Sequence, residues 1–100
     1  MKVAYTQRAK RDLASIYERG LKVWGERIAR QVERRIFLEC TGLGRAPTLG
    51  AATDLANVRR LPIVRYPFTI FYRVVFEEDR VEILRIVHSG AVRDLGDVPS

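Results

Sequence analysis

The sequence is poor in cysteine, histidine and lysine. Cys40 is the one cysteine and His88 the one histidine among 100 residues. A single cysteine cannot form an internal disulfide, which favours a reducing compartment. Without a cluster of cysteine and histidine, no metal site and no cofactor are predicted. Because His88 is remote in sequence, Cys40 is expected to be a small buried residue and not a catalytic thiol.

The sequence also lacks a long apolar run. No stretch approaches the roughly 20 residues that span a bilayer. Met1 to Tyr5 leads directly into charged residues, so no signal peptide is predicted. These features predict a cytoplasmic protein with no membrane partner. At this length, residues 1–100 are expected to form a single domain.

Arginine dominates the charge of the chain. Lysine and arginine number 18 against 12 acidic residues, for a formal net charge of +6, and only three of the basic residues are lysines. Guanidinium groups contact phosphate or carboxylate through paired hydrogen bonds. We therefore expect an acidic partner, either a nucleic acid or an acidic protein segment. For the helical arginines, a merely solvated face remains the alternative.

Two helices are predicted in the first half. The first is expected from Gln7 to Trp24, with Thr6 as its N-cap and Gly25 as its stop. The second is expected from Glu26 to Thr41, antiparallel to the first. Apolar residues recur at three- and four-residue spacing along the first helix, namely Ala9, Leu13, Ile16, Tyr17 and Trp24. The stripe of the second helix is Ile28, Val32, Ile36 and Cys40, with Phe37 beside it.

Three strands are predicted in the second half. They are Val58 to Ile63, Phe68 to Phe76 and Val81 to His88, with a charged turn at residues 77–80. A short strand is also expected at Lys2 to Thr6. The fold class is therefore α+β with the order β-α-α-β-β-β, in which a helical hairpin covers one face of a mainly antiparallel sheet.

The last two strands can be paired on paper. If the turn centres on Glu78 and Asp79, Phe76 pairs with Val81 and two faces result. The face expected to meet the helices carries Phe68, Ile70, Tyr72, Val74, Phe76, Val81, Ile83, Arg85 and Val87. The other carries Thr69, Phe71, Arg73, Val75, Glu82, Leu84, Ile86 and His88. This second, mixed face is the expected binding surface, although a slip of one residue would exchange the two faces.

One arginine falls on the apolar face in this register. A buried Arg85 would need a partner, and Asp12 in the first helix is the candidate for a structural ion pair. Arg59 and Arg60 are expected to point to opposite faces of their strand. Arg65 is expected to be exposed in the turn that follows.

Several motifs resemble the RelE/ParE superfamily of toxins from bacterial type II toxin–antitoxin modules. They are A-x-x-D-L-x-x-I-Y at residues 9–17, the Trp24-Gly25 break, V-R-R-L-P-x-x-x-Y-P-F-x-I-F-Y-R-V at residues 58–74, and V-E-I-L-R-I-x-H at residues 81–88. The likeness covers nearly the whole chain and is closest to the ParE branch. It implies the fold predicted above and a cognate antitoxin that wraps and neutralises the toxin in a hetero-oligomer. It also implies roles in growth arrest and plasmid stabilisation.

The two branches of the superfamily imply different targets. The RelE branch cuts messenger RNA on the ribosome, whereas the ParE branch poisons DNA gyrase. This chain has Thr69 where the RelE branch has a basic residue early in the strand. It also has Ser89-Gly90-Ala91-Val92 where that branch has basic and tyrosine groups. Both departures favour a gyrase inhibitor with no catalytic residues. The candidate target-binding residues are Arg60, Arg65, Arg73, His88 and Arg93.

Two other functions stay open. A ribosome-dependent mRNA endonuclease would use Glu82 or His88 as acid or base and Arg73 as the clamp on the phosphate charge. A lone histidine at a strand end is more often a hydrogen-bonded structural residue. A basic adaptor that only binds nucleic acid would instead show salt-sensitive affinity without growth arrest.

Overall fold

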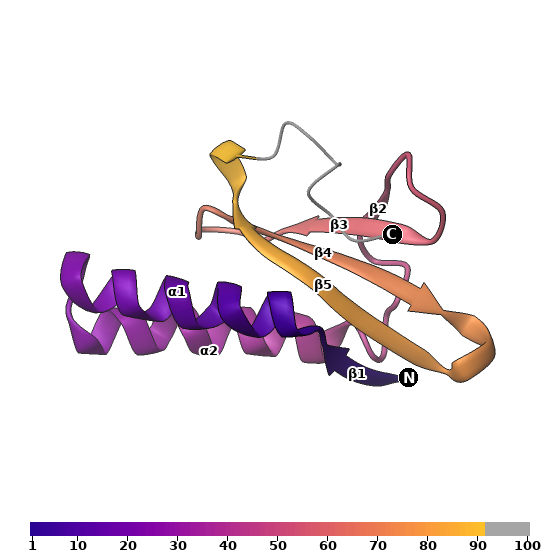
Figure 1. The fold of residues 1–100 in the computed structure, drawn as a ribbon, viewed down its shortest axis with the longest axis horizontal. Coiled ribbons are helices and arrows are strands. Elements are labelled where there is room, and N and C mark those ends of the chain that lie inside the picture. Colours follow the sequence, from indigo (N-terminus) through magenta and orange to yellow (C-terminus); the bar gives the residue numbers. More distant parts are fainter. Residues whose placement is uncertain (92–100) are drawn as a thin grey trace.

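A helical hairpin covers one face of a five-stranded sheet in this protein (Figure 1). The structure is a computed structural model and describes residues 1–91. Its elements are β1 (Lys2–Tyr5), α1 (Gln7–Val23), α2 (Glu26–Gly42), β2 (Ala51–Ala52), β3 (Val58–Pro62), β4 (Phe68–Val75) and β5 (Arg80–His88). The strand order is β1-β5-β4-β3-β2, with β1 parallel to β5 and the other pairs antiparallel. The predicted α+β fold is confirmed, and β2 is an additional strand. In the described part of the chain, neither helix is long and apolar enough to cross a bilayer.

The hairpin depends on two glycines. Gly25 has φ of +85°, a left-handed conformation that glycine adopts without strain, and it separates α1 from α2 as predicted. Gly20 faces Ala29 closely enough that an added Cβ would lie 3.1 Å from the Ala29 Cβ. The placement of Trp24 in the apolar stripe is wrong: it caps the end of α1 and is 42% exposed.

The main core lies between the helices and the sheet. It contains Val32, Ile36, Cys40 and Leu43 from the hairpin side, and Phe68, Ile70, Tyr72, Val74, Val81, Ile83 and Ile86 from β4 and β5. Cys40 is fully buried, as expected from the sequence. Burial raises the pKa of its thiol to about 12, so the thiol stays protonated and unreactive near neutral pH.

Tyr72 anchors the loop that follows α2. Its hydroxyl accepts from the Gly50 N–H at 2.8 Å and donates to the Pro47 carbonyl at 2.8 Å. Arg59 Nη1 donates to the Gly50 carbonyl at 2.7 Å. A Cβ on Gly50 would lie 2.7 Å from the Arg60 carbonyl oxygen, so this position admits only glycine without a backbone shift. The loop is thereby fastened to the edge of the sheet, where β2 begins.

The β4–β5 turn lies one residue earlier than predicted. Val75 pairs with Arg80, and Phe76 opens a short 3-10 turn in which it is 56% exposed. The expected pairing of Phe76 with Val81 and its place in the core are therefore wrong. Because the cross-strand partner of each β4 residue near the turn changes by two residues, the side chains there keep their predicted faces.

A β-bulge changes the faces farther along β5. Tyr72 pairs with Ile83, but Phe71 pairs with Arg85, so Leu84 is an extra residue in the ladder. Beyond it, Ile86 packs in the main core, while Val87 packs in a second cluster with Val58, Phe71 and Leu84 on the opposite face. The predicted faces of the last four residues, Arg85, Ile86, Val87 and His88, are therefore wrong.

Candidate functional site

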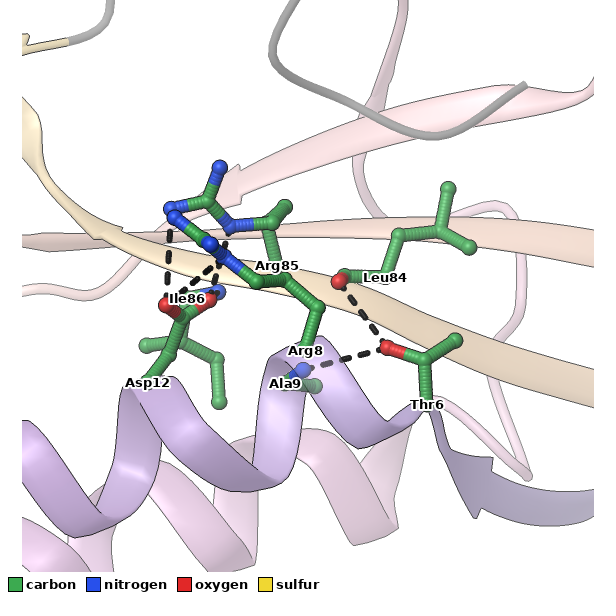
Figure 2. Close-up of polar contacts among 7 residues, drawn as sticks. All are labelled: Thr6, Arg8, Ala9, Asp12, Leu84, Arg85 and Ile86. Carbon is green, nitrogen blue, oxygen red and sulfur yellow. Dashed lines mark hydrogen bonds and ion pairs between the residues drawn. The ribbon is translucent and has the colours of Figure 1, made fainter.

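Asp12 gathers three partners at the edge of β5 (Figure 2). Its Oδ2 accepts from Arg85 Nε at 2.9 Å and from the Ile86 backbone N–H at 2.9 Å. Arg85 Nη2 reaches Oδ1 at 3.4 Å, and Arg8 Nε lies 3.6 Å from the same oxygen. The side chains of Arg85 and Asp12 are only 11% and 12% exposed. The ion pair suggested by the sequence therefore forms in a largely buried setting, where losing one member is costly.

The sheet face away from the helices carries a row of charged residues. Arg73 lies opposite Glu82 across β4 and β5, and the exposed Arg60 lies opposite Phe71 across β3 and β4. Glu82 Oε2 is 3.3 Å from Arg80 Nη2, whose guanidinium also binds Glu78 at 3.0 and 3.3 Å. The Glu82 carboxylate is thus an ion-pair partner of Arg80.

His88 does not join Arg73 and Glu82. It lies opposite Phe68, with the two ring centroids 5.9 Å apart in an edge-to-face arrangement. Six residues of extended strand separate it from Glu82, about 20 Å at the usual rise per residue. Its Nδ1 accepts from the Gly90 N–H at 3.2 Å. The predicted common face of these three residues is wrong, because the bulge turns the end of β5 over.

His88 instead lies beside the β3–β4 turn. Ser89 N–H donates to the Pro67 carbonyl at 2.8 Å, and the Ser89 and Thr69 hydroxyls are 3.0 Å apart. The same turn presents Arg65, exposed and with φ of +77°. We call Arg65, Tyr66, His88 and Ser89 the turn corner. Arg93, the last of the predicted target contacts, lies outside the described residues.

These surfaces present cationic and aromatic side chains that could bind a partner. Thr69 is 3% exposed and is hydrogen-bonded to Ser89, so it offers no charge to a phosphate. Within residues 1–91, no group of three histidine, cysteine, aspartate or glutamate side chains could hold a metal ion. The described candidates thus split into two sets, Arg60 and Arg73 on the sheet face and Arg65 and His88 at the turn corner.

An apolar surface on the hairpin was not predicted as a site. Phe37 and Leu38 are 54% and 55% exposed, although both are large apolar residues. Leu13 and Phe37, with Glu33 and Arg34, line an open hollow of about 370 Å³. The signal in the sequence was that Phe37 and Leu38 fall outside the four-residue spacing of the buried stripe of α2. An exposed patch of this kind marks an interaction site more often than a scattered single residue does. We call Leu13 and Phe37, which both line this hollow, the hairpin patch.

Comparison with known proteins gives a family match over most of the chain. Residues 3–92 match the family model described as ParE toxin of type II toxin-antitoxin system, parDE. The comparison with curated proteins gave no match. Among solved structures, the chain is similar to a chromosomal ParDE TA system from P. aeruginosa, with 28% identity and a TM-score of 0.77. The aligned part covers 88% of this chain and 95% of that one.

Two RelBE complexes share the fold. The RelBE2 toxin-antitoxin complex from Mycobacterium tuberculosis is 23% identical, with a TM-score of 0.61 and coverage of 87% of this chain and 95% of that one. The intact E. coli RelBE toxin-antitoxin complex is 10% identical, with a TM-score of 0.59 and coverage of 87% and 94%. At these identities the likeness concerns the fold alone.

Proposed function

Because the chain belongs to the ParE toxin family of type II toxin–antitoxin systems, we propose that it inhibits DNA gyrase by binding it, and that a cognate antitoxin neutralises it. Growth arrest follows from the loss of gyrase activity, and a cytoplasmic location follows from the target. Retention of the carrying replicon, as in plasmid stabilisation, would follow if cells that lose the gene pair lose the antitoxin first.

The separation of the candidate acid–base groups carries this proposal. Cleavage of RNA without a metal needs an acid and a base on either side of one phosphate. Here Glu82 is paired with Arg80, and His88 lies at the other end of β5 beside Phe68. Thr69, at the place where a nuclease relative would be basic, is buried and neutral. This arrangement favours a protein that binds its target over one that cuts RNA.

The target surface is proposed to include the turn corner. Arg65 precedes β4 and His88 ends β5, and the Ser89–Pro67 hydrogen bond joins the two segments at one end of the sheet. Arg93 follows two residues after the described part and is included in the proposal. Arg60 and Arg73 lie on the adjoining sheet face and would extend the contact.

The antitoxin is proposed to cover the hairpin patch. Residues 1–42 carry ten lysine and arginine residues against five acidic ones, so the segment that carries the patch is basic. An amphipathic segment could place apolar side chains against Phe37 and acidic ones against the surrounding cations. To neutralise the chain, the rest of the antitoxin would have to block access to the turn corner.

Induction of the chain in a bacterial host tests the proposed target. We expect growth arrest together with DNA breaks and the DNA-damage response, because a poisoned gyrase leaves cleaved DNA. Co-expression of the antitoxin should abolish all three effects. New 5′ ends on translated messages, found by primer extension in the absence of DNA breaks, would contradict the proposal and favour the endonuclease.

Matched variants make the same test specific. Arg65→Ala combined with His88→Ala should relieve the arrest while leaving antitoxin binding intact. Arg27→Ala, which removes an exposed arginine beside the Gly25 turn of the hairpin, should leave the growth arrest unchanged. If the double variant arrests growth as strongly as the unmodified chain, the turn corner is not the contact.

A further inference from the structure

The bulge in β5 prevents the burial of a charge. From Arg73–Glu82 and Tyr72–Ile83, a regular ladder would continue by placing Arg85 opposite Ile70. Ile70 is fully buried in the main core, so that register would drive a guanidinium into an apolar layer. With Leu84 as the extra residue, Ile86 takes the place opposite Ile70 instead. The bulge thus exchanges a charged residue for an apolar one in the core.

Thr6 and Asp12, at the start of α1, hydrogen-bond the backbone groups that β5 exposes at the bulge. β1 pairs with β5 only as far as Ile83. Beyond that point, Thr6 N–H donates to the Ile83 carbonyl at 3.0 Å, and Thr6 Oγ1 donates to the Leu84 carbonyl at 3.1 Å. Asp12 then accepts from the Ile86 N–H at 2.9 Å. Figure 2 shows the Thr6–Leu84 and Asp12–Ile86 contacts on one side of β5. A helix thereby supplies the groups that a neighbouring strand would otherwise offer.

Of Thr6 and Asp12, only Asp12 binds both the backbone of β5 and the side chain of Arg85. Its carboxylate takes the Ile86 N–H, which lies beyond the end of the β1 pairing, and it neutralises the arginine that the bulge turns out of the core. Thr6 already has a local role, since its hydroxyl accepts from Ala9 N–H and caps α1. Two residues after Ile86, the strand ends at His88, whose ring meets Phe68 only in the bulged register.

We propose that Asp12 is a positioning residue: by holding the bulge, it sets the register of the end of β5 and so places His88 in the turn corner. The link to target binding rests on the gyrase function proposed above. The effect on the strand stands without it. Asp12 lies on α1 and is not itself part of the turn corner, so it acts through β5.

Asp12→Ala removes both contacts and provides the main test. The purified variant should keep its helical content, while the His88–Phe68 contact, seen as a ring-proton nuclear Overhauser effect, is lost. Hydrogen exchange at the Ile86 amide should accelerate on the order of tenfold relative to the Ile70 amide, because a strand N–H loses its acceptor. An unchanged His88–Phe68 contact together with unchanged Ile86 exchange would overturn the proposal.

Two further variants separate positioning from general stability. Asp12→Asn keeps an oxygen for the Ile86 N–H and should restore the His88–Phe68 contact, even if Asp12→Ala does not fold. Ile36→Val loosens the main core without touching Asp12 and should leave that contact intact. Loss of the contact in Ile36→Val to the same degree as in Asp12→Ala would mean that any destabilisation frees the end of β5, and would overturn the proposal.

Gyrase inhibition is measured on the same samples. Asp12→Ala should raise the concentration needed for half-inhibition at least about tenfold, and Asp12→Asn should recover most of the loss. If the unmodified chain does not inhibit gyrase, the proposed function fails, and the resonance and exchange data still decide the role of Asp12 in the strand. If His88 moves and inhibition is unchanged, the role of Asp12 in target binding is overturned.

Discussion

Cys40 is buried in the main core, and the Tyr5 hydroxyl lies close to its sulfur. Burial is the main cause that raises its thiol pKa from 9.0 to about 12, and burial also raises the pKa of the nearby Tyr5 phenol. Both groups therefore stay neutral in the folded chain at pH values where they ionise in the unfolded one. The stability that this contributes is fully present below pH 9 and is lost as the pH rises towards 12.

The pH dependence of unfolding tests the burial of Cys40. The free energy of unfolding of the unmodified chain should fall between pH 9 and 11, with the thiol contributing at most about 1.4 kcal/mol per pH unit. Cys40→Ala should reduce this slope, because the unfolded state no longer gains an ionised thiol. The folded chain should also react slowly with a thiol reagent at pH 8. Fast labelling without denaturant would contradict the buried placement.

Tyr72 gives a second test at the scale of one side chain. Tyr72→Phe removes the acceptor of Gly50 N–H and the donor to Pro47, and we expect a loss of about 1–3 kcal/mol in the free energy of unfolding. Tyr66→Phe is the matched control, because the Tyr66 hydroxyl has no hydrogen bond to another described residue. Equal effects of the two substitutions in a urea titration would argue against the anchoring of the loop.

At the scale of the elements, the turn between α1 and α2 requires glycine because of its backbone conformation, and not because a side chain would clash. A Cβ at Gly25 would meet nothing within 4 Å, but its φ is +85°. Gly25→Ala should therefore cost about 1–2 kcal/mol in the free energy of unfolding. Gly42, the last residue of α2, also has open space around it and lacks a positive φ.

Gly42→Ala is the control for this turn. Alanine has the higher helix propensity, so the substitution should be neutral or stabilise the chain by up to about 1 kcal/mol. Thermal unfolding monitored by circular dichroism compares the two variants. If Gly25→Ala were as stable as Gly42→Ala, the left-handed conformation of Gly25 would be wrong.

The elements also show how far sequence reasoning reaches. The three- and four-residue spacing from Ala9 to Tyr17, the Thr6 cap and the Gly25 stop are local signals, and the structure contains all of them. The bulge at Leu84 has no local signal, because it depends on what Arg85 would meet across the sheet in Ile70. Strand β2 was missed because two alanines carry no strand pattern and pair only once the loop is anchored by Tyr72.

The same limit applies to the candidate site. The Asp12–Arg85 pair was predicted by asking where a charge on an apolar face could find a partner, and it forms despite the wrong register. The common face of Arg73, Glu82 and His88 was wrong, because the bulge turns only the last of the three over. The hairpin patch went unnoticed because an exposed Phe37 cannot be told from a buried one until the orientation of the helix is known.

At the scale of the whole molecule, the proposed antitoxin and target surfaces lie on different layers. The hairpin patch is on the helical layer, whereas Arg65 and His88 are at one end of the sheet. Phe37→Asp should therefore leave growth arrest intact while the antitoxin no longer rescues the cells, because an acidic group replaces an apolar contact in a surface built for an acidic partner.

Phe76→Asp is the control for antitoxin binding. Phe76 is as exposed as Phe37, at 56% against 54%, but it lies in the β4–β5 turn away from the hairpin. Rescue by the antitoxin should be normal in this variant. A co-purification assay with tagged antitoxin gives the same comparison outside cells. Loss of binding in both variants, or in neither, would exclude the hairpin patch as the specific contact.

The most direct test of the central claim is a supercoiling assay with purified gyrase, relaxed plasmid and the purified chain. Inhibition of supercoiling with accumulation of linear, gyrase-linked DNA is expected, and addition of the antitoxin should reverse it. Arg27→Ala should behave as the unmodified chain does, whereas the Arg65→Ala and His88→Ala double variant should be impaired. Undisturbed supercoiling with no trapped cleaved DNA, at concentrations that arrest growth, would contradict the account.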